Sequence, residues 1–231
     1  MNLSWLAFWD GPHWIYVSAR HKDVHYRLIA REIAALVPEP QARVLDYGCG
    51  EALHASEVAA AAGELVLCEG APRLRAGLAA RFAGNSKIYV LAPDDVAHLP
   101  AHSLDLVVLH SVAQYLTAQQ ADALFALFHR LLGPGGVLVV SDVIAPYVPG
   151  ATDAVALIRF AAANGFLLAA LTGIARTLMS DYMRLRARLG LTRYDEATML
   201  QKLAAAGFAG ERAAKNIGHN PARMTFIARR G

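Results

Sequence analysis

The fold is decided by a short apolar run that passes into two closely spaced glycines, Val44-Leu45-Asp46-Tyr47-Gly48-Cys49-Gly50. Such a run predicts a buried strand followed by a sharp turn that brings bare backbone close to a ligand. A helix is predicted to begin at Leu53, and the unpaired N–H groups of its first turn favour a polar or anionic ligand. The dinucleotide pattern G-x-G-x-x-G is incomplete, because Leu53 stands where its last glycine would be.

Around this run, short segments rich in Val, Ile and Leu alternate with longer helical patterns. This alternation predicts an α/β fold with a doubly wound, mostly parallel, Rossmann-like sheet, whose ligands bind beyond the carboxyl ends of the strands. A turn signal at residues 218–221 predicts a C-terminal antiparallel hairpin, which makes a seven-stranded sheet. The predicted strands are residues 43–47, 64–68, 87–91, 104–109, 137–141, 211–217 and 223–228, and the predicted helices between them are 53–62, 72–82 and 117–132. Residues 133–136, Gly-Pro-Gly-Gly, are expected to form a turn before the fifth strand.

Two further regions are predicted to be helical and to lie outside the central sheet. Residues 1–38 are expected to form an N-terminal lid, with an amphipathic helix at 23–37 that ends before Pro38. Residues 39–231 are expected to form the binding domain, with a helical insertion at about 151–192 that contains one or two helices. A last helix is predicted at 195–206.

Composition limits the class of protein and its partners. The hydrophobic fraction of 55% and the charged fraction of 18% indicate a folded chain, and two cysteines cannot build a disulfide framework. No secretory leader is visible, so a cytoplasmic location is expected. The longest uncharged stretch, residues 160–175, is shorter than the roughly 20 residues that span a bilayer, and stable membrane insertion is not expected. Residues 176–231 hold 11 Lys and Arg against 4 Asp and Glu, but the absence of interleaved aromatics argues against nucleic acid as a partner.

Residues 43–144 resemble the class I S-adenosylmethionine-dependent methyltransferases. The first motif of that family is a hydrophobic residue followed by Leu-Asp-x-Gly-x-Gly-x-Gly, and this chain matches it through Gly50, with Ala52 in place of the third glycine. Glu69 stands 19 residues after Gly50 and matches the family's acidic residue that binds both ribose hydroxyls. A carboxylate suits that task because its two oxygens accept two donors at once.

Three later segments follow in the order of the family. Asp95 matches the residue that contacts the adenine amino group, Asp94 is an adjacent rival, and the backbone of Val96 is expected nearby. Residues 103–108 and 131–138 resemble the fourth strand and the turn into the fifth strand. The resemblance therefore implies S-adenosylmethionine as cofactor. It implies that cofactor-binding residues include Asp46, Gly48, Gly50, Glu69, Asp94, Asp95, Val96 and His110. A purely structural role remains open for Asp46 and the glycines, which would then only shape the loop.

Candidates for the acceptor side come from loops at the carboxyl edge of the sheet. His110, Tyr115 and His219 are candidate catalytic residues, because a base is needed where the acceptor must lose a proton. Related small-molecule enzymes often bind the methionine carboxylate through an N-terminal segment, for which Tyr16, Arg20 and Arg27 are candidates. The aromatic and histidine residues of that segment are Trp5, Phe8, Trp9, His13, Trp14, Tyr16, His21, His25 and Tyr26.

His21 and His25 lie four residues apart and would share one helical face, as metal ligands do. Without a third ligand in view, the favoured interpretation is two partly exposed histidines, and no metal site is predicted.

The favoured function is methyl transfer to a small, partly hydrophobic acceptor. The alternatives are a catalytically inactive cofactor-binding module that acts through a partner, and a nicotinamide-dependent oxidoreductase. The sequence leaves open the identity of the acceptor, the atom that is methylated (oxygen, nitrogen, carbon or sulfur) and the oligomeric state. The segment after the fourth strand, His110-Ser111-Val112-Ala113, does not carry the Asn/Asp-Pro-Pro-aromatic motif of enzymes that methylate amino groups.

Overall fold

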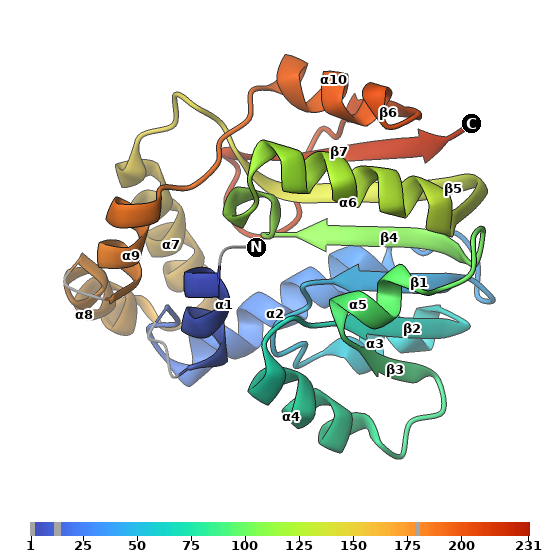
Figure 1. The fold of residues 1–231 in the computed structure, drawn as a ribbon. Coiled ribbons are helices and arrows are strands. Elements are labelled where there is room, and N and C mark those ends of the chain that lie inside the picture. The colour runs from blue at the N-terminus through green and yellow to red at the C-terminus, as the bar shows by residue number, and fades with distance from the viewer. Residues whose placement is uncertain (1–2, 12–14, 179–180) are drawn as a thin grey trace.

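The computed structural model describes residues 3–11, 15–178 and 181–231 (Figure 1). His13 and Trp14 of the N-terminal aromatic segment lie outside these described residues. The described residues contain a seven-stranded sheet with the order β3-β2-β1-β4-β5-β7-β6. β1 to β5 pair in parallel, and β7 runs antiparallel to both β5 and β6. The strands are β1 (Arg43–Tyr47), β2 (Glu64–Cys68), β3 (Ile88–Leu91), β4 (Leu104–His110), β5 (Leu132–Ile144), β6 (Phe208–Arg212) and β7 (Arg223–Arg230).

Helices cover both faces of the sheet, because alternate residues of each buried strand point to opposite sides. Leu45 of β1 packs in one hydrophobic cluster with Phe125 and Phe128, and its neighbour Val44 packs in another with Ile33 and Val58. The first cluster joins the sheet to α5 (Pro93–Ala97), α6 (Ala118–Leu131) and α10 (Glu196–Ala205). The second joins it to α2 (Ala19–Ala34), α3 (Ala55–Ala61) and α4 (Pro72–Phe82). The predicted doubly wound, mostly parallel fold with a C-terminal antiparallel pair is confirmed.

The remaining helices gather beyond the carboxyl ends of the parallel strands (Figure 1). They are α1 (Leu3–Asp10), α7 (Gly150–Asn164), α8 (Leu167–Leu178) and α9 (Asp181–Leu189), with the short helix η1 (Ala113–Tyr115) nearby. The described part of the insertion after β5 is divided into α7, α8 and α9, where one or two helices were predicted, and Gly165, with a φ of +74°, ends α7. No helix of the described residues is both long and apolar enough to cross a membrane.

Several predicted boundaries are wrong for local reasons. The strand predicted at 211–217 begins at Phe208 and ends at Arg212, because Gly207, with a φ of +92°, turns the chain directly out of α10. Residues 133–136, predicted as a turn, belong to β5. The helix predicted at 23–37 begins at Ala19, since the side chain of Ser18 accepts a hydrogen bond from the His21 N–H and caps it.

Candidate cofactor and acceptor site

The loop that follows β1 requires glycine at both motif positions. Gly48 has a φ of +78° and Gly50 a φ of +60°, which is the left-handed region. A Cβ atom on Gly48 would lie 2.5 Å from the Cγ2 atom of Val112, and one on Gly50 would lie 2.7 Å from the hydroxyl of Tyr26. A side chain at either position would therefore adopt a strained backbone conformation and displace the side chain of Val112 or Tyr26.

Glu69 ties this loop to the end of β2. Its Oε2 atom accepts a hydrogen bond from the Gly50 N–H at 3.0 Å, and its Oε1 atom accepts one from the Ala71 N–H at 2.8 Å. The side chain of Arg75 donates to the Glu69 carbonyl at 2.8 Å. Burial raises the pKa of Glu69, and these backbone N–H groups oppose that shift by stabilising the carboxylate. The loop and the acidic residue that the sequence motifs name are thus brought together.

Asp46 lies at the end of β1, close enough to Glu69 for the two carboxyl groups to interact. Burial, and then repulsion by Glu69, raise the pKa of Asp46 to about 7. Two carboxylates therefore face one small region at the carboxyl edge of β1 and β2. A ligand that brings hydroxyl or ammonium donors to this place relieves their repulsion.

The two aspartates at the start of α5 have different surroundings. The Oδ2 atom of Asp95 accepts a hydrogen bond from the Ala92 N–H at 3.1 Å, so its carboxylate caps its own helix. Asp94 uses its backbone carbonyl to contact the Nδ1 atom of His98 at 2.7 Å. Both aspartates are exposed, whereas Val96 is fully buried in the core.

The N-terminal candidates separate into two groups. Tyr16 packs against Tyr26, with ring centroids 5.8 Å apart, and the Tyr26 hydroxyl accepts a hydrogen bond from the Glu51 N–H at 3.0 Å. This pair therefore lies beside the glycine loop. The guanidinium of Arg20 instead donates to the carbonyl of Asn164 at 3.2 Å, and Arg27 pairs with Asp23 at 3.1 Å along α2. Tyr26, named in the sequence only as one of several aromatics, contacts the motif loop directly, and Lys22 pairs with the Glu51 carboxylate at 2.6 Å.

A polar network occupies the carboxyl ends of β4 and β5. The Nδ1 atom of His110 lies 2.9 Å from the Ser141 hydroxyl, and the Ser111 hydroxyl donates to Asp142 at 2.6 Å. Ser111 and Asp142 have φ angles of +57° and +60°, which non-glycine residues rarely adopt. Strained residues of this kind are retained where the surrounding structure holds them, and they cluster at functional sites.

Histidines from three parts of the chain meet beside this network. The ring of His25 lies 5.8 Å from that of His219 and 6.1 Å from that of His21, measured between centroids. His219 stacks on Phe160 at 4.5 Å, and His21 stacks on Phe166 at 5.0 Å. The interpretation of His21 as partly exposed is wrong, because the stacking leaves only 5% of its surface exposed.

The pKa values of these imidazoles are all lowered. Burial lowers the pKa of His21 to about 4, and burial also lowers the pKa of His25, His110 and His219. The neighbouring imidazoles add to the shift: His110, His219 and His21 each lower the pKa of His25 further. The cluster is therefore neutral at pH 7. Among the described residues, no group of three or more His, Cys, Asp or Glu side chains is arranged to hold a metal ion.

Tyr115 belongs to a separate aromatic cluster. Its ring lies 4.8 Å from that of Trp5 and 5.7 Å from that of Trp9, which joins η1 to α1. Trp5 also contacts Tyr182 of α9, with centroids 5.9 Å apart. The aromatic N-terminus and the insertion after β5 thus meet beside η1, which follows β4.

Residues 44–136 match the model of a family described as a methyltransferase domain. Among solved structures, N-methyltransferase NodS from Bradyrhizobium japonicum with bound S-adenosyl-L-homocysteine has 16% identity and a TM-score of 0.61, and the match covers 98% of this chain and 97% of that chain. Magnesium protoporphyrin IX methyltransferase ChlM from Synechocystis, also with this product, has 18% identity, a TM-score of 0.61 and coverages of 98% and 93%. The pyocyanin biosynthetic protein PhzM has 16% identity and a TM-score of 0.59; the match covers 89% of this chain but only 55% of that chain. A search of curated proteins gave no significant match.

These matches agree with the motifs and their geometry. Residues 44–136 match a methyltransferase domain, and the fold of the described residues is the one shared with these methyltransferases, in agreement with the motifs that resemble the S-adenosylmethionine-dependent class. The expectation of a methyltransferase fold and enzyme class is confirmed. The acceptor is not determined by these matches.

Proposed function

We propose that this chain binds S-adenosylmethionine at the carboxyl edge of β1 and β2 and transfers its methyl group to a small, partly hydrophobic acceptor. The observation that carries the proposal is the contact between the two cofactor motifs, in which Glu69 accepts a hydrogen bond from the Gly50 N–H. Each carboxylate oxygen of Glu69 holds one backbone N–H and retains a lone pair for a further donor. The two ribose hydroxyls of the cofactor fit this fixed carboxylate.

The surrounding residues fit the other parts of the same ligand. The bare backbone of Gly48 and Gly50 allows close approach of the methionine portion, and Asp94 has its carboxylate available for the adenine amino group, whereas Asp95 caps α5. When bound, the cofactor supplies an electrophilic methyl group. Tyr16 and Tyr26 line the loop from the side of α2 and are suited to contact the methionine carboxylate.

The acceptor is proposed to lie between the sheet edge and a lid built from residues 1–38 and 151–192. Trp5, Tyr115 and Tyr182 form apolar walls there, and His25, His110 and His219 supply polar groups. Sites for small ligands are mostly apolar with a few polar groups that set orientation. Holding donor and acceptor in line supplies much of the catalysis in such a transfer.

Titration calorimetry with S-adenosyl-L-homocysteine, repeated with NAD, tests this proposal. We expect saturable one-site binding of the former and no binding of the latter. Binding of NAD alone would favour the oxidoreductase alternative. Incubation with S-adenosylmethionine and a panel of small aromatic acceptors separates an enzyme from an inactive module, because only an enzyme releases the demethylated cofactor together with a methylated product.

A further inference from the structure

His25 occupies a position between the cofactor loop and the ends of the sheet strands. On α2 it is next to Tyr26, whose hydroxyl binds the Glu51 N–H of that loop. On its other side it faces His110, at the end of β4, and His219, in the connection between β6 and β7. A methyl group presented from the glycine loop towards β4 would therefore arrive beside the His25 ring.

The Nδ1 atom of His25 is buried, and no hydrogen-bond partner is found for it among the described residues. A buried ring nitrogen without a partner is costly, so such an atom calls for a ligand. The comparable atoms nearby are engaged, since His110 Nδ1 lies against the Ser141 hydroxyl and His21 Nδ1 accepts from the Val17 N–H at 3.3 Å. Of the Nδ1 atoms of these three histidines, that of His25 is thus the one without a partner among the described residues and is left for the acceptor.

The charged groups around the histidine cluster favour a hydroxyl over an ammonium group as the acceptor. The groups that face His25 are Tyr16, His21 and Tyr26 from its own segment, His110 from β4 and His219 from the last connection. The carboxylates beyond them are already paired: Asp142 accepts from Ser111, and Asp153 accepts from Asn220 and Arg223. A cationic ammonium would find no uncommitted carboxylate among these groups, whereas a hydroxyl finds a neutral nitrogen that accepts its proton.

The aromatic side chains around the histidine cluster indicate that the acceptor hydroxyl is attached to a flat, apolar ring. Phe160 stacks on His219, Phe166 stacks on His21, and Tyr16 packs on His25 with centroids 5.6 Å apart. Aromatic faces of this kind favour an aromatic ring as neighbour and exclude water from the reacting atoms.

We propose that His25 is the general base of this site, and that the acceptor is an aromatic hydroxyl methylated on oxygen. The acceptor oxygen forms the bond to the methyl carbon, the sulfur–methyl bond breaks with its electron pair going to sulfur, and the hydroxyl proton passes to His25 Nδ1 and then to water. His110 and His219 orient the hydroxyl from the opposite side. This inference rests on the proposed methyltransferase function.

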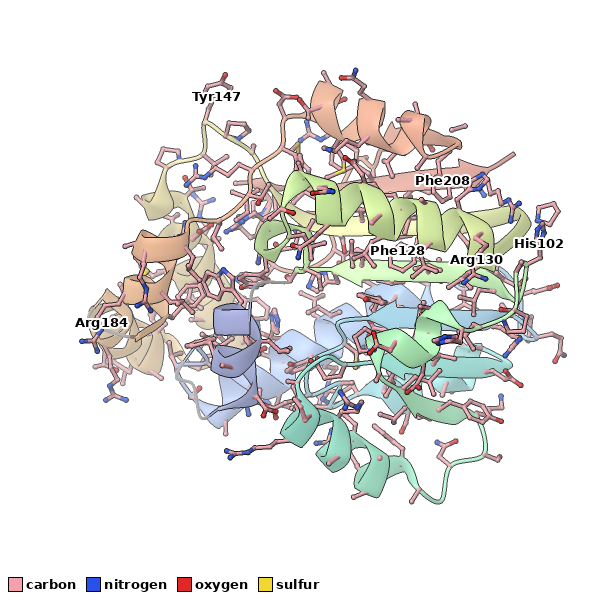
Figure 2. All side chains as sticks on the ribbon, viewed as in Figure 1. His102, Phe128, Arg130, Tyr147, Arg184 and Phe208 are labelled. Carbon is pink, nitrogen blue, oxygen red and sulfur yellow. The ribbon has the colours of Figure 1, made fainter. Side chains whose placement is uncertain are left out.

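The test uses para-cresol and para-toluidine, which differ only in the acceptor atom, with the wild-type chain, His25→Gln and the control His102→Gln. His102 lies at the far edge of the sheet from the lid helices (Figure 2). We expect para-cresol, and not para-toluidine, to be methylated. We expect His25→Gln to lower kcat about 100-fold or more, with KM changed much less, because glutamine accepts a hydrogen bond but takes no proton. Calorimetry in the presence of S-adenosyl-L-homocysteine should show para-cresol binding several-fold weaker in His25→Ala and unchanged in His102→Gln.

The pH profile separates a base from a structural residue. A base must be neutral to act, and burial lowers the pKa of His25, so the wild-type rate should stay level through the ordinary histidine pKa of about 6.5 and fall only at lower pH. In His25→Gln the rate should instead rise with pH as the phenol itself ionises. Preferential methylation of para-toluidine, an unchanged rate and profile in His25→Gln, or no binding of para-cresol would each overturn the inference. Failure of the wild-type chain to bind S-adenosyl-L-homocysteine would overturn the proposed function instead.

Discussion

The Ser111 hydroxyl donates to the Asp142 carboxylate at 2.6 Å, and both residues hold φ angles near +60° at the ends of neighbouring strands. Ser111 directly follows His110, the last residue of β4, so the strained backbone lies beside the His110 side chain. This hydrogen bond therefore holds the two strained residues together at the carboxyl edge of the sheet, where we expect the acceptor to bind.

Removal of this hydrogen bond should destabilise the chain. Ser111→Ala keeps the strained φ and leaves the carboxylate without its donor, so we expect the free energy of unfolding to fall by about 1–3 kcal/mol. Ser111→Gly is the matched control, because it also loses the hydrogen bond but relieves the strain, and it should lose about 1 kcal/mol less. Urea denaturation measures both, and equal losses in the two variants would contradict a strained Ser111.

Glu69→Ala should weaken binding of S-adenosyl-L-homocysteine about tenfold or more, since a hydrogen bond to a charged group is worth roughly 1.5–3 kcal/mol. Loss of the carboxylate also frees the Gly50 N–H and loosens the glycine loop. The control is Glu211→Ala, which removes an exposed carboxylate on β6, far from the loop in the strand order. Equal affinities of wild type and Glu69→Ala by calorimetry would remove Glu69 from the site.

Ala52 stands where the family's first motif has its third glycine, and it adopts a φ of +41°. The left-handed region costs a residue with a Cβ roughly 1–2 kcal/mol, of which the greater flexibility of unfolded glycine offsets about 0.5–1 kcal/mol. Ala52→Gly should therefore stabilise the fold by about 0.5–1 kcal/mol. Ala80→Gly, on the exposed side of α4, should lower stability by about 1 kcal/mol. A destabilised Ala52→Gly variant would show that packing of the buried methyl group outweighs the strain.

The raised pKa of Asp46 predicts a particular pH dependence of stability. Between the ordinary value of about 3.9 and the folded value, the folded chain holds a proton that the unfolded chain has lost. The contribution is fully present below the unfolded value and is lost as the pH rises towards about 7. Asp46→Asn should therefore gain stability relative to wild type as the pH rises from about 4 to about 7. The lowered histidine pKa values make stability rise with pH, which is the opposite trend. They act equally in wild type and in Asp46→Asn, so the difference in unfolding free energy between the two proteins reports on Asp46 alone. A constant difference across this range would contradict the raised pKa.

The sheet and the cofactor motifs were predictable because they depend on local patterns. β1 and β2 lie at the predicted residues, and α4 begins at Pro72 as expected from the preference of proline for the first helical turn. The positions of Gly48, Gly50 and Glu69 followed from motif spacing, since parallel strands end at one edge of the sheet.

The acceptor side was not predictable in the same way, because it is built from segments far apart in the chain. His25 and His219 meet only through the packing of α2 against the final connection, and two histidines at helical spacing gave no sign of that partner. The strain at Ser111 and Asp142 depends on strand pairing and leaves no local signal in residues that are not glycine. The short helix α5 was missed because five residues are too few for a periodic pattern.

The central claim, that Glu69 and the glycine loop form the S-adenosylmethionine site, is tested most directly by a crystal structure of the chain with S-adenosyl-L-homocysteine. We predict that both ribose hydroxyls lie within hydrogen-bond distance of the Glu69 carboxylate, and that the sulfur faces His25 and His110. A ligand bound elsewhere on the chain, or one whose ribose makes no contact with Glu69, would contradict the account.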